Sequence, residues 1–465
     1  MPKYDFDLIC IGSGPAGQRA AVQAAKLGKR VAVIERQHCA GGVCVDKGTI
    51  PSKTFREAVL SYTGFSNRFL SRQDRNIENK VTSEKLLKEV NEVILKESGI
   101  IEHQLQRNNV VLKRGIGSFE DLHSVRISFG SGSHVFSSDK ILIATGSKPA
   151  LYPDPNQDRN VVVTSDDLPF LESIPRTMSV IGAGVIGIEY ASIFAALGVE
   201  VTVVDRRKKL LEFIDHEIVD ELMQQMRKMR VTFRLEESVE KIETGRDSTQ
   251  GGVITLQSGG EITGDIILYS AGRVGATDGL NLDRVGLKAD FQGRIKVNAN
   301  FQTEMPHIYA AGDVIGFPSL AATSSEQGRL ASRHAFKGDT GGMAEHFPFG
   351  IYALPEISMV GRTEQELVDS KIPYETGVAR YREIARGQIL GDDSGLLKML
   401  FHTDTKQLLG VHAIGTGATE LIHIGQAVLR LSGGLDYFLH TVFNYPTLAE
   451  CYKVAAWNAA NKMAL

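Results

Sequence analysis

The sequence predicts an α/β protein in which one strand–helix–strand unit occurs twice and a third segment of mixed strands and helices follows. The first unit runs from Asp7 to Arg36 and the second from Met178 to Arg206. In both, an apolar strand ends in a glycine cluster, a helix rich in small residues follows, and a second apolar strand ends in an acid. The two units match at a constant offset of 170 residues, so the chain contains an internal repeat.

Each unit carries the pattern GxGxxG between its first strand and its helix. The glycines are Gly12, Gly14 and Gly17 in the first unit, and Gly182, Gly184 and Gly187 in the second. In such a motif the first glycine permits a tight turn, the second lets the backbone approach a pyrophosphate, and the third lets helix and strand pack closely. Two copies in this context predict two Rossmann-like dinucleotide-binding folds. The alternative is that these glycines only make tight turns.

An acid closes each unit 23 positions after its first glycine, where it can accept hydrogen bonds from an adenosine ribose. The first acid is Glu35, followed by Arg36. The second is Asp205, followed by Arg206 and Arg207. A carboxylate favours the free 2′-hydroxyl of NAD(H), whereas guanidinium groups pair with the 2′-phosphate of NADP(H). The combination predicts a second site that tolerates either nucleotide, unless one or both arginines are merely solvated.

Length and composition bound the remaining possibilities. A chain of 465 residues suits about three domains. Lys and Arg total 52 against 55 Asp and Glu, a balance that offers no global field for nucleic acid or an anionic membrane. Four cysteines in so long a chain are not a disulfide scaffold, and the N-terminus does not have the pattern of a signal peptide. We therefore expect a cytoplasmic protein.

The repeat also suggests the domain boundaries. We expect one dinucleotide-binding domain over residues 1–150, resuming at 280–345, and an inserted second one over 151–279. Helical periodicity covers 84–108, and another helix is expected at 216–228. From about residue 346 the pattern of strands and helices changes, which predicts a third domain over 346–465.

Four further segments resemble the FAD-dependent pyridine nucleotide–disulfide oxidoreductases, in the order that this family has them. They are GGVCVDKGTIPSK at 41–53, ATG at 144–146, IYAAGDV at 308–314 and NYPTLAE at 444–450. The resemblance implies a glutathione-reductase-like fold, with an FAD domain, an NAD(P) domain and a C-terminal α+β dimerisation domain. It also implies a homodimer, or a larger homo-oligomer, whose active site is built across the subunit interface.

The resemblance implies a role for individual residues. Lys53 would lie beside the flavin ring, paired with Glu189, where its charge can stabilise the reduced flavin. Asp313 would bind the ribityl chain. The residues expected to bind FAD are Gly12, Gly14, Pro15, Ala16, Gly17, Glu35, Arg36, Gly42, Cys44, Lys53, Thr145, Gly146, Asp313 and Ala321. Those expected to bind NAD(P) are Gly182, Gly184, Ile186, Gly187, Glu189, Asp205, Arg206, Arg207 and Gly272. The histidines have no ligand spacing, so no metal site is expected.

The chain departs from the family pattern at both of its thiol sites. Cys44 holds the place of the first redox cysteine, but Thr49 stands where the second should be, and a hydroxyl cannot form a disulfide. Near the C-terminus the family's His-Pro pair is replaced by Tyr445-Pro446, and tyrosine is a poor base near neutrality because its pKa is about 10. A redox pair between Cys39 and Cys44 is the alternative.

These departures resemble those of the soluble pyridine nucleotide transhydrogenases. The implied activity is hydride transfer between NADPH and NAD⁺ through FAD by a ping-pong mechanism, without a redox disulfide. Two alternatives are an NAD(P)H dehydrogenase that passes electrons to quinones or another small acceptor, and a flavin-bound redox sensor or interaction protein with Cys44 as its switch.

Overall fold

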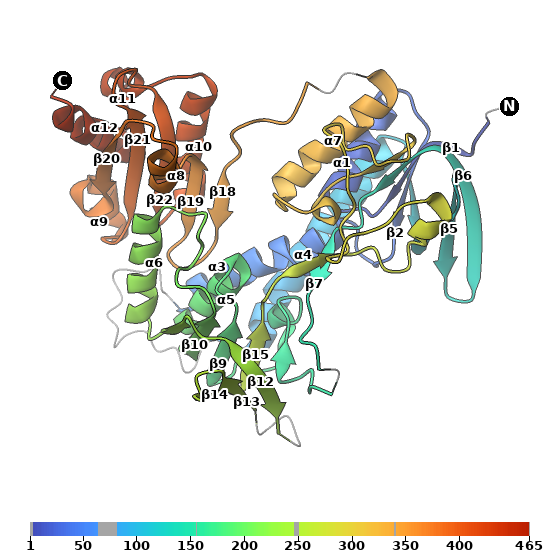
Figure 1. Cartoon of the computed structure of the whole chain (residues 1–465), viewed down its shortest axis with the longest axis horizontal. Coiled ribbons are helices and arrows are strands. Elements are labelled where there is room, and N and C mark those ends of the chain that lie inside the picture. Colours follow the sequence, from blue (N-terminus) through green and yellow to red (C-terminus); the bar gives the residue numbers. More distant parts are fainter. Residues whose placement is uncertain (1–2, 64–80, 155, 246–250, 339–340, 465) are drawn as a thin grey trace.

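The computed structural model describes residues 3–63, 81–154, 156–245, 251–338 and 341–464. Three parts of the molecule are visible in Figure 1, with the N-terminal sheet on the right, the second sheet below it and the C-terminal sheet on the left. Mixed α/β architecture was predicted and is confirmed. No helix in these ranges is both long enough and apolar enough to cross a bilayer.

The first sheet has a parallel core that carries the first glycine motif. Its order is β3-β2-β1-β6, with β17 also paired to β6; β5 extends the sheet by antiparallel pairing with β6, and β4 pairs antiparallel with β5. The strands are β1 Phe6–Ile11, β2 Val31–Glu35, β3 Val111–Arg114, β4 Ile116–Asp121, β5 Ser124–Phe129, β6 Gly132–Ile143 and β17 Ile308–Ala310. β2 is buried along its whole length, which explains its unbroken apolar run.

The second sheet repeats this construction and is parallel throughout, in the order β11-β10-β9-β15-β8. Its strands are β8 Val162–Val163, β9 Thr177–Ile181, β10 Glu200–Asp205, β11 Thr232–Leu235 and β15 Ile266–Tyr269. The helices that follow the glycine motifs are α1, Pro15–Lys26, and α5, Val185–Ala196. The bounds of these two helices differ by the same 170 residues as the sequence motifs, so the predicted repeat is confirmed as a structural one.

The motif glycines have the conformations that such a turn requires. Gly12 and Gly182 adopt φ values of 109° and 103°, which residues with a side chain rarely adopt. A Cβ atom on Gly17 would lie 1.9 Å from the carbonyl oxygen of Gly12, and one on Gly187 would lie 2.0 Å from that of Gly182. The third glycine therefore packs against the first in both units and turns the helix N-terminus toward the ends of the strands.

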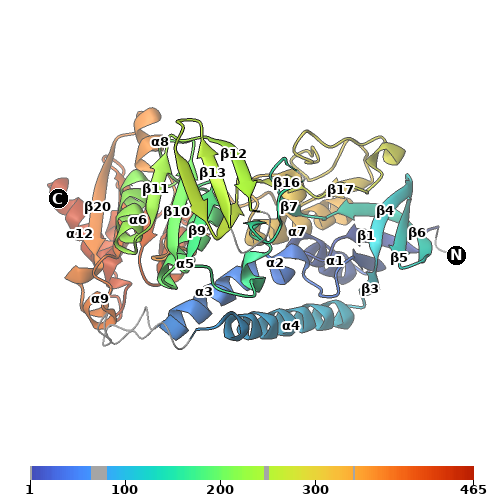
Figure 2. The same cartoon turned by 90° about the horizontal axis from the view of Figure 1, so that it is seen from below.

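Four more helices surround the first sheet: α2 Gly42–Asp46, α3 Thr49–Thr63, α4 Ser83–Arg107 and α7 Ala321–Lys337. Figure 2 shows α3 and α4 running along one edge of the molecule. The helix expected at 84–108 is α4. In Figure 1, α7 lies against α1. The contact is close because a Cβ atom on Gly328 would lie 2.0 Å from the carbonyl oxygen of Ala16. This packing brings the segment before α7 beside the first glycine motif.

The third part is an antiparallel sheet covered by helices, in the order β18-β19-β22-β21-β20. The elements are β18 Phe349–Ile351, β19 Ile357–Gly361, β20 Tyr374–Arg380, β21 Leu396–His402, β22 Leu408–Ile414, α10 Ala418–Arg430, α11 Leu435–His440 and α12 Glu450–Lys462. Most of its buried side chains form a core of their own, while others, such as Ile351 and Ile357, pack into the core of the rest of the molecule.

Buried ion pairs join this third part to the other two. Lys398 of β21 is 1% exposed, and its ammonium lies 2.9 Å from Asp215, the N-cap of helix α6 (His216–Lys228) in the second unit. Glu217 and Glu364 also contact this ammonium. Arg56 of α3 pairs with Glu356, which precedes β19, at 3.3 Å. Because breaking a buried pair leaves an uncompensated charge, these contacts hold the three parts in a fixed arrangement.

Candidate functional site

One large cavity, with a volume of about 560 Å³, lies where the three parts of the chain meet. Thirteen of the fourteen residues expected to bind FAD line it, namely Gly12, Gly14, Pro15, Ala16, Glu35, Arg36, Gly42, Cys44, Lys53, Thr145, Gly146, Asp313 and Ala321. The fourteenth, Gly17, packs under the turn instead. Ile186 and Glu189 of α5 reach the same cavity from the second unit. The structure therefore brings the first glycine motif and helix α5 of the second unit to the same cavity.

The acid of the first unit is held from two sides. Glu35 is 4% exposed, and its Oε2 accepts hydrogen bonds from the backbone N–H and the hydroxyl of Ser13, at 3.1 and 2.6 Å. Its Oε1 accepts one from the backbone N–H of Gln37, at 2.8 Å. A carboxylate offers about four acceptor positions. Glu35 thus keeps one position on Oε1 with which to bind a ribose hydroxyl.

The first glycine motif is closed over by the following loop. A Cβ atom on Gly42 would lie 2.9 Å from the Cα atom of Gly14, so the start of α2 rests on the motif. Gly42 itself adopts φ 62°. Only a residue without a side chain fits this approach, because any Cβ would press on Gly14. A dinucleotide bound at the first motif is therefore enclosed by the segment 41–46.

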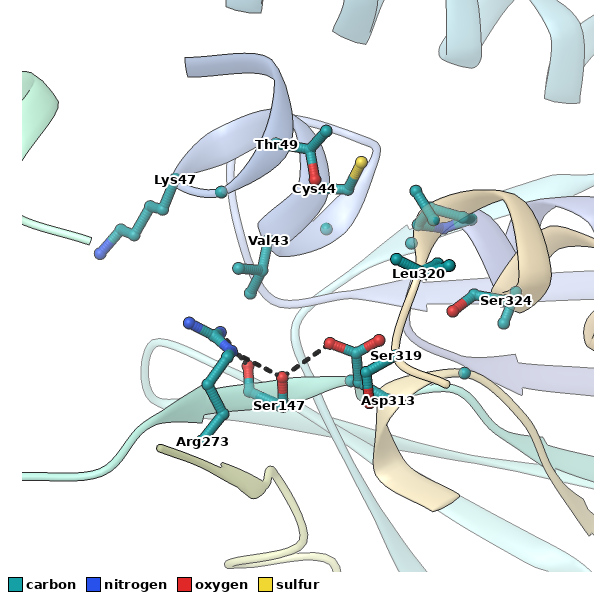
Figure 3. Close-up of a pocket in the computed structure, with 18 of the residues that line it drawn as sticks. Val43, Cys44, Lys47, Thr49, Ser147, Arg273, Asp313, Ser319, Leu320 and Ser324 are labelled. Carbon is teal, nitrogen blue, oxygen red and sulfur yellow. Dashed lines mark hydrogen bonds between the residues drawn. The ribbon is translucent and has the colours of Figure 1, made fainter. Parts of the chain in front are cut away.

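Cys44 and Thr49, at the two positions where the resembled family has its redox cysteines, meet at the corner between α2 and α3. Figure 3 shows the Cys44 thiol and the Thr49 hydroxyl next to each other above the cavity. The pKa of Cys44 is raised by burial, an effect that a hydrogen bond with Thr49 only partly opposes. A neutral thiol is a weak nucleophile. All four cysteines of the chain are free, and Cys39 packs at the edge of the core rather than lining the cavity.

An ion pair crosses the cavity between the two units. Lys53 of α3 lies 2.8 Å from Oε2 of Glu189 in α5, and these side chains are 26% and 6% exposed. Oε1 of Glu189 accepts a hydrogen bond at 2.8 Å from the backbone N–H of Tyr352, just after β18. The Lys53 ammonium also lies 4.9 Å from the centre of the Tyr352 ring, within the range of a cation–π interaction. All three parts of the chain thus fix the position of one positive charge.

A network of polar side chains lies across the cavity from Cys44 and Thr49 (Figure 3). Asp313 accepts a hydrogen bond from the Ser147 hydroxyl at 2.8 Å, and that hydroxyl accepts one from Nε of Arg273 at 2.9 Å. Figure 3 shows Ser147 between the other two side chains. Arg273 also pairs with Asp166 at 3.4 Å. Ser147 begins β7 (Ser147–Pro149), and Arg273 begins β16 (Arg273–Gly275). Because these two strands pair with each other, the backbone sets the distance between the Ser147 and Arg273 side chains.

The remaining residues expected to bind NAD(P) lie outside the lining of this cavity. They are Gly182, Gly184, Gly187, Asp205, Arg206, Arg207 and Gly272. Gly184 has no atom within 4 Å of the position of a Cβ, so the second motif is not closed over as the first one is. Asp205 is 6% exposed and is engaged by Arg207, whereas Arg206 is exposed.

The residues that replace the family's second thiol site lie far along the chain, between α11 and α12. Tyr445 is 68% exposed. One carboxylate oxygen of Glu450, at the start of α12, is buried and has no hydrogen-bond partner among the described residues. The exposed tyrosine and this unsatisfied acid both belong to the third part of the chain.

The cavity fits FAD on two observations of the structure itself. The glycine turn and the overlying Gly42 leave room for a backbone-bound pyrophosphate but not for a side chain. The hydroxyl of Thr145 is buried at the cavity wall and has no hydrogen-bond partner within the described ranges, so a bound ligand would satisfy it. The expected set omitted Ser147, Arg273 and Tyr352. No local signal points to Tyr352, because it stands 163 positions from its partner Glu189.

Comparison with known proteins agrees with this geometry. A family model for pyridine nucleotide-disulphide oxidoreductases matches residues 6–328, and one for the dimerisation domain of the same family matches residues 347–456. Among solved structures, the HOCl-induced flavoprotein disulfide reductase RclA from Escherichia coli superposes with a TM-score of 0.86 at 25% identity, covering 97% of this chain and 99% of that one. LpdA from Mycobacterium tuberculosis superposes with a TM-score of 0.87 at 26% identity, with the same coverage.

Curated relatives are closer in sequence. The soluble pyridine nucleotide transhydrogenase of Mycobacterium tuberculosis is 50% identical over 461 residues, covering 99% of this chain and 98% of that protein. The protein of the same name from Photobacterium profundum is 43% identical over 463 residues, covering 98% of each. By fold, site and sequence, this chain belongs to the pyridine nucleotide-disulphide oxidoreductase family.

Proposed function

We propose that this protein is an FAD-dependent transhydrogenase that moves a hydride between NADPH and NAD⁺. The observation that carries the proposal is the corner where Cys44 faces Thr49. The family has a pair of thiols at this corner, whereas this chain has the single thiol of Cys44. The electrons then need an acceptor that reaches the flavin directly, and a second nicotinamide dinucleotide entering the same pocket is the most economical one. Similarity to the soluble pyridine nucleotide transhydrogenases over nearly the full chain supports the same activity.

Each unit has a separate role in this proposal. FAD bound in the first unit would supply the hydride-carrying chemistry that links the two nicotinamide dinucleotides. The first glycine motif, Glu35 and the closing loop at Gly42 would hold it, with Thr145 and Asp313 at the flavin end. The second glycine motif would bind NADPH and NAD⁺ in turn, with Ile186 and Glu189 at the boundary between the two sites.

The Lys53–Glu189 pair is the main electrostatic element of the cavity. Glu189 is nearly buried and accepts bonds from both Lys53 and Tyr352, which orients the carboxylate. Lys53 keeps about a quarter of its side chain exposed to the cavity. Its ammonium can stabilise negative charge that develops beside it, because a preoriented cation needs no rearrangement during the reaction. The same ammonium would serve both directions of hydride transfer.

We infer that the active unit is a homodimer. The match to the family's dimerisation domain over 347–456 supports self-association. The exposed Tyr445 supports a contact at that surface, because a second copy would cover its ring. A cytoplasmic location is supported by the four free cysteines, since free thiols are usual in a reducing compartment.

An anaerobic titration with NADPH tests the proposal directly. We expect uptake of two electrons per FAD, without a long-wavelength thiolate–flavin charge-transfer band, followed by rapid reduction of thio-NAD⁺ by the NADPH-reduced enzyme. Four electrons per FAD would contradict it and would indicate a thiol pair formed by Cys39 and Cys44. The T49C variant is the matched control, because it restores the second cysteine and is expected to raise the uptake toward four electrons.

Steady-state assays with other substrates separate the alternatives. Efficient turnover with dihydrolipoamide or glutathione disulfide, with slow thio-NAD⁺ reduction, would refute a transhydrogenase. Efficient turnover with quinones alone would indicate an NAD(P)H dehydrogenase. Slow turnover with every acceptor, together with a loss of cellular function in C44S, would indicate a redox sensor.

A further inference from the structure

The acid of the second unit, Asp205, is saturated by protein donors. Its Oδ2 accepts hydrogen bonds from the backbone N–H of Ala183 at 2.6 Å and from a terminal nitrogen of Arg207 at 2.7 Å. Its Oδ1 accepts two more, at 2.8 Å from the backbone N–H of Arg207 and at 2.9 Å from Nε of that residue. These four bonds fill the roughly four acceptor positions of a carboxylate. Asp205 therefore has none left for a ribose hydroxyl.

The first unit shows that this saturation comes from a single side chain. Gln37 stands at the position equivalent to Arg207, at the 170-residue offset. Its backbone N–H donates to Glu35 at 2.8 Å, as the backbone N–H of Arg207 does to Asp205. Within the described ranges, however, the side chain of Gln37 has no hydrogen bond to Glu35. The backbone arrangement is shared, and the guanidinium fork is the feature that the second unit adds.

Resting on the proposed function, we propose that Arg207 is the residue that adapts the second site to both nucleotides. Paired with Asp205, it cancels a carboxylate charge that would repel a 2′-phosphate. The pairing uses two of the five N–H groups of the guanidinium and leaves three. Its side chain is 37% exposed, so these donors are accessible to a phosphate. NADP(H) binds with the fork in place, and Arg207 bridges Asp205 and the 2′-phosphate.

NAD(H) has no such phosphate and binds in the other arrangement. Its 2′-hydroxyl takes the place of the Arg207 fork on Asp205, and the guanidinium turns out to solvent. The carboxylate keeps its bonds to the backbone N–H groups of Ala183 and Arg207, which correspond to the two backbone bonds of Glu35. Glu35 also accepts a bond from the Ser13 hydroxyl, for which Ala183 has no counterpart. Rotation of the Arg207 side chain thus converts the site between a form that favours a 2′-phosphate and a form that favours a 2′-hydroxyl. Arg206, although it adjoins the acid, has no part in the selection.

Binding of nucleotide fragments to the FAD-loaded enzyme tests this without using turnover. Calorimetry would give the dissociation constants of 2′-phospho-ADP-ribose and of ADP-ribose for the wild type and for R207Q, which reproduces the first unit. We expect 2′-phospho-ADP-ribose to bind about 10- to 100-fold more weakly to R207Q, the usual effect of losing a hydrogen bond between charged groups. ADP-ribose should bind as well or several-fold better, because no ion pair has to be opened.

Two variants in the same loop complete the experiment. K208Q removes the same charge from an exposed neighbour, so it controls for general electrostatic attraction, and its effect on either constant should stay below about 2-fold. An effect of R207Q no larger than that of K208Q would overturn the proposal, as would a larger loss of 2′-phospho-ADP-ribose binding in R206Q. The two proposals can fail separately. If R207Q changes the dissociation constants as expected but the wild type fails to reduce thio-NAD⁺, the proposed function is wrong and the role of Arg207 in nucleotide selection stands.

Discussion

The two dinucleotide-binding units share a fold but differ in how closely the glycine motif is covered and in how the acid at the end of the second strand is hydrogen-bonded. In the first unit, Gly42 rests on the second motif glycine, and in the second unit no non-neighbouring atom of the described residues lies within 4 Å of the Cβ position of the equivalent Gly184. The first acid keeps an acceptor position for its ribose, whereas the second is closed by its own arginine. A bound group that stays needs enclosure, and a substrate that must leave on every turnover needs an open site. The two units therefore have the same glycine turns, but the first is the more enclosed and the second the more open.

Matched substitutions at the second glycines should give the largest contrast. Gly14 and Gly184 have φ values of −60° and −79°, so alanine fits the backbone at both positions. The added methyl group would lie where the pyrophosphate approaches. We expect G14A to be purified without FAD and to lose activity about 100-fold, which absorbance and turnover would show. G184A should retain FAD and raise KM about 10-fold for both nucleotides, an effect of about 1.4 kcal/mol. Loss of FAD from G184A would break the comparison.

The ion pair between the units should matter equally in both half-reactions. We expect K53M to slow hydride transfer from NADPH and to NAD⁺ by about 10²-fold each, because the preoriented charge is lost. Rapid-mixing measurements of each half-reaction would show this, and K53R should recover part of the rate. Glu189 would be left buried without its partner, so a lower melting temperature is also expected. A defect confined to one half-reaction would indicate that Lys53 serves only one nucleotide.

A smaller change is expected when the second acid is neutralised. In D205N, the ribose hydroxyl of NAD(H) would meet a neutral amide, which binds it less strongly than a carboxylate does. The ratio of kcat/KM for NADPH to that for NADH should rise about 10-fold, corresponding to about 1.4 kcal/mol. The equivalent substitution in the first unit, E35Q, should weaken FAD retention and leave this ratio unchanged. A shift of the ratio in E35Q would mean that the units do not act separately.

The smallest expected effect concerns stability. Burial acts to raise the pKa of Asp205, but the hydrogen bonds from Arg207 and Ala183 outweigh it and hold the pKa below its ordinary range. A lowered folded-state pKa stabilises the protein above the unfolded value of about 3.9, and this contribution is lost as the pH falls through the folded value. The wild type should be more stable than R207Q near pH 7, by less than about 1 kcal/mol because Arg207 is partly exposed.

Denaturant unfolding at a series of pH values would measure this difference. It should shrink as the pH drops below about 4. A difference that stays constant down to about pH 3 would show that the pair does not contribute through the charge of Asp205. K208Q, which breaks no described ion pair, should follow the wild type at every pH.

Sequence reasoning was most reliable where the pattern is local. The strands, turns and helices of both units follow from glycine positions and apolar runs within a single strand–helix–strand unit, and the structure confirms them. The helix expected at 216–228 has those bounds in α6. The expected domain boundaries and the roles of the site residues stay predictions. Most of the expected FAD residues nevertheless lie around one cavity, because each belongs to a short motif whose geometry is nearly fixed by its own residues.

The amino-acid sequence was enough to show that the chain repeats a dinucleotide-binding fold, and that threonine replaces one of the two cysteines that the family pattern has. Both conclusions depend on the identity of residues, which tertiary packing does not change. Two contacts became known from the folded chain alone: Arg207, and not Arg206, engages Asp205, and Tyr352 supports Glu189 across 163 positions. The direction of a side chain at the end of a strand depends on the loop that carries it, and contacts between distant segments depend on how whole layers pack. Neither leaves a periodic signal in the sequence.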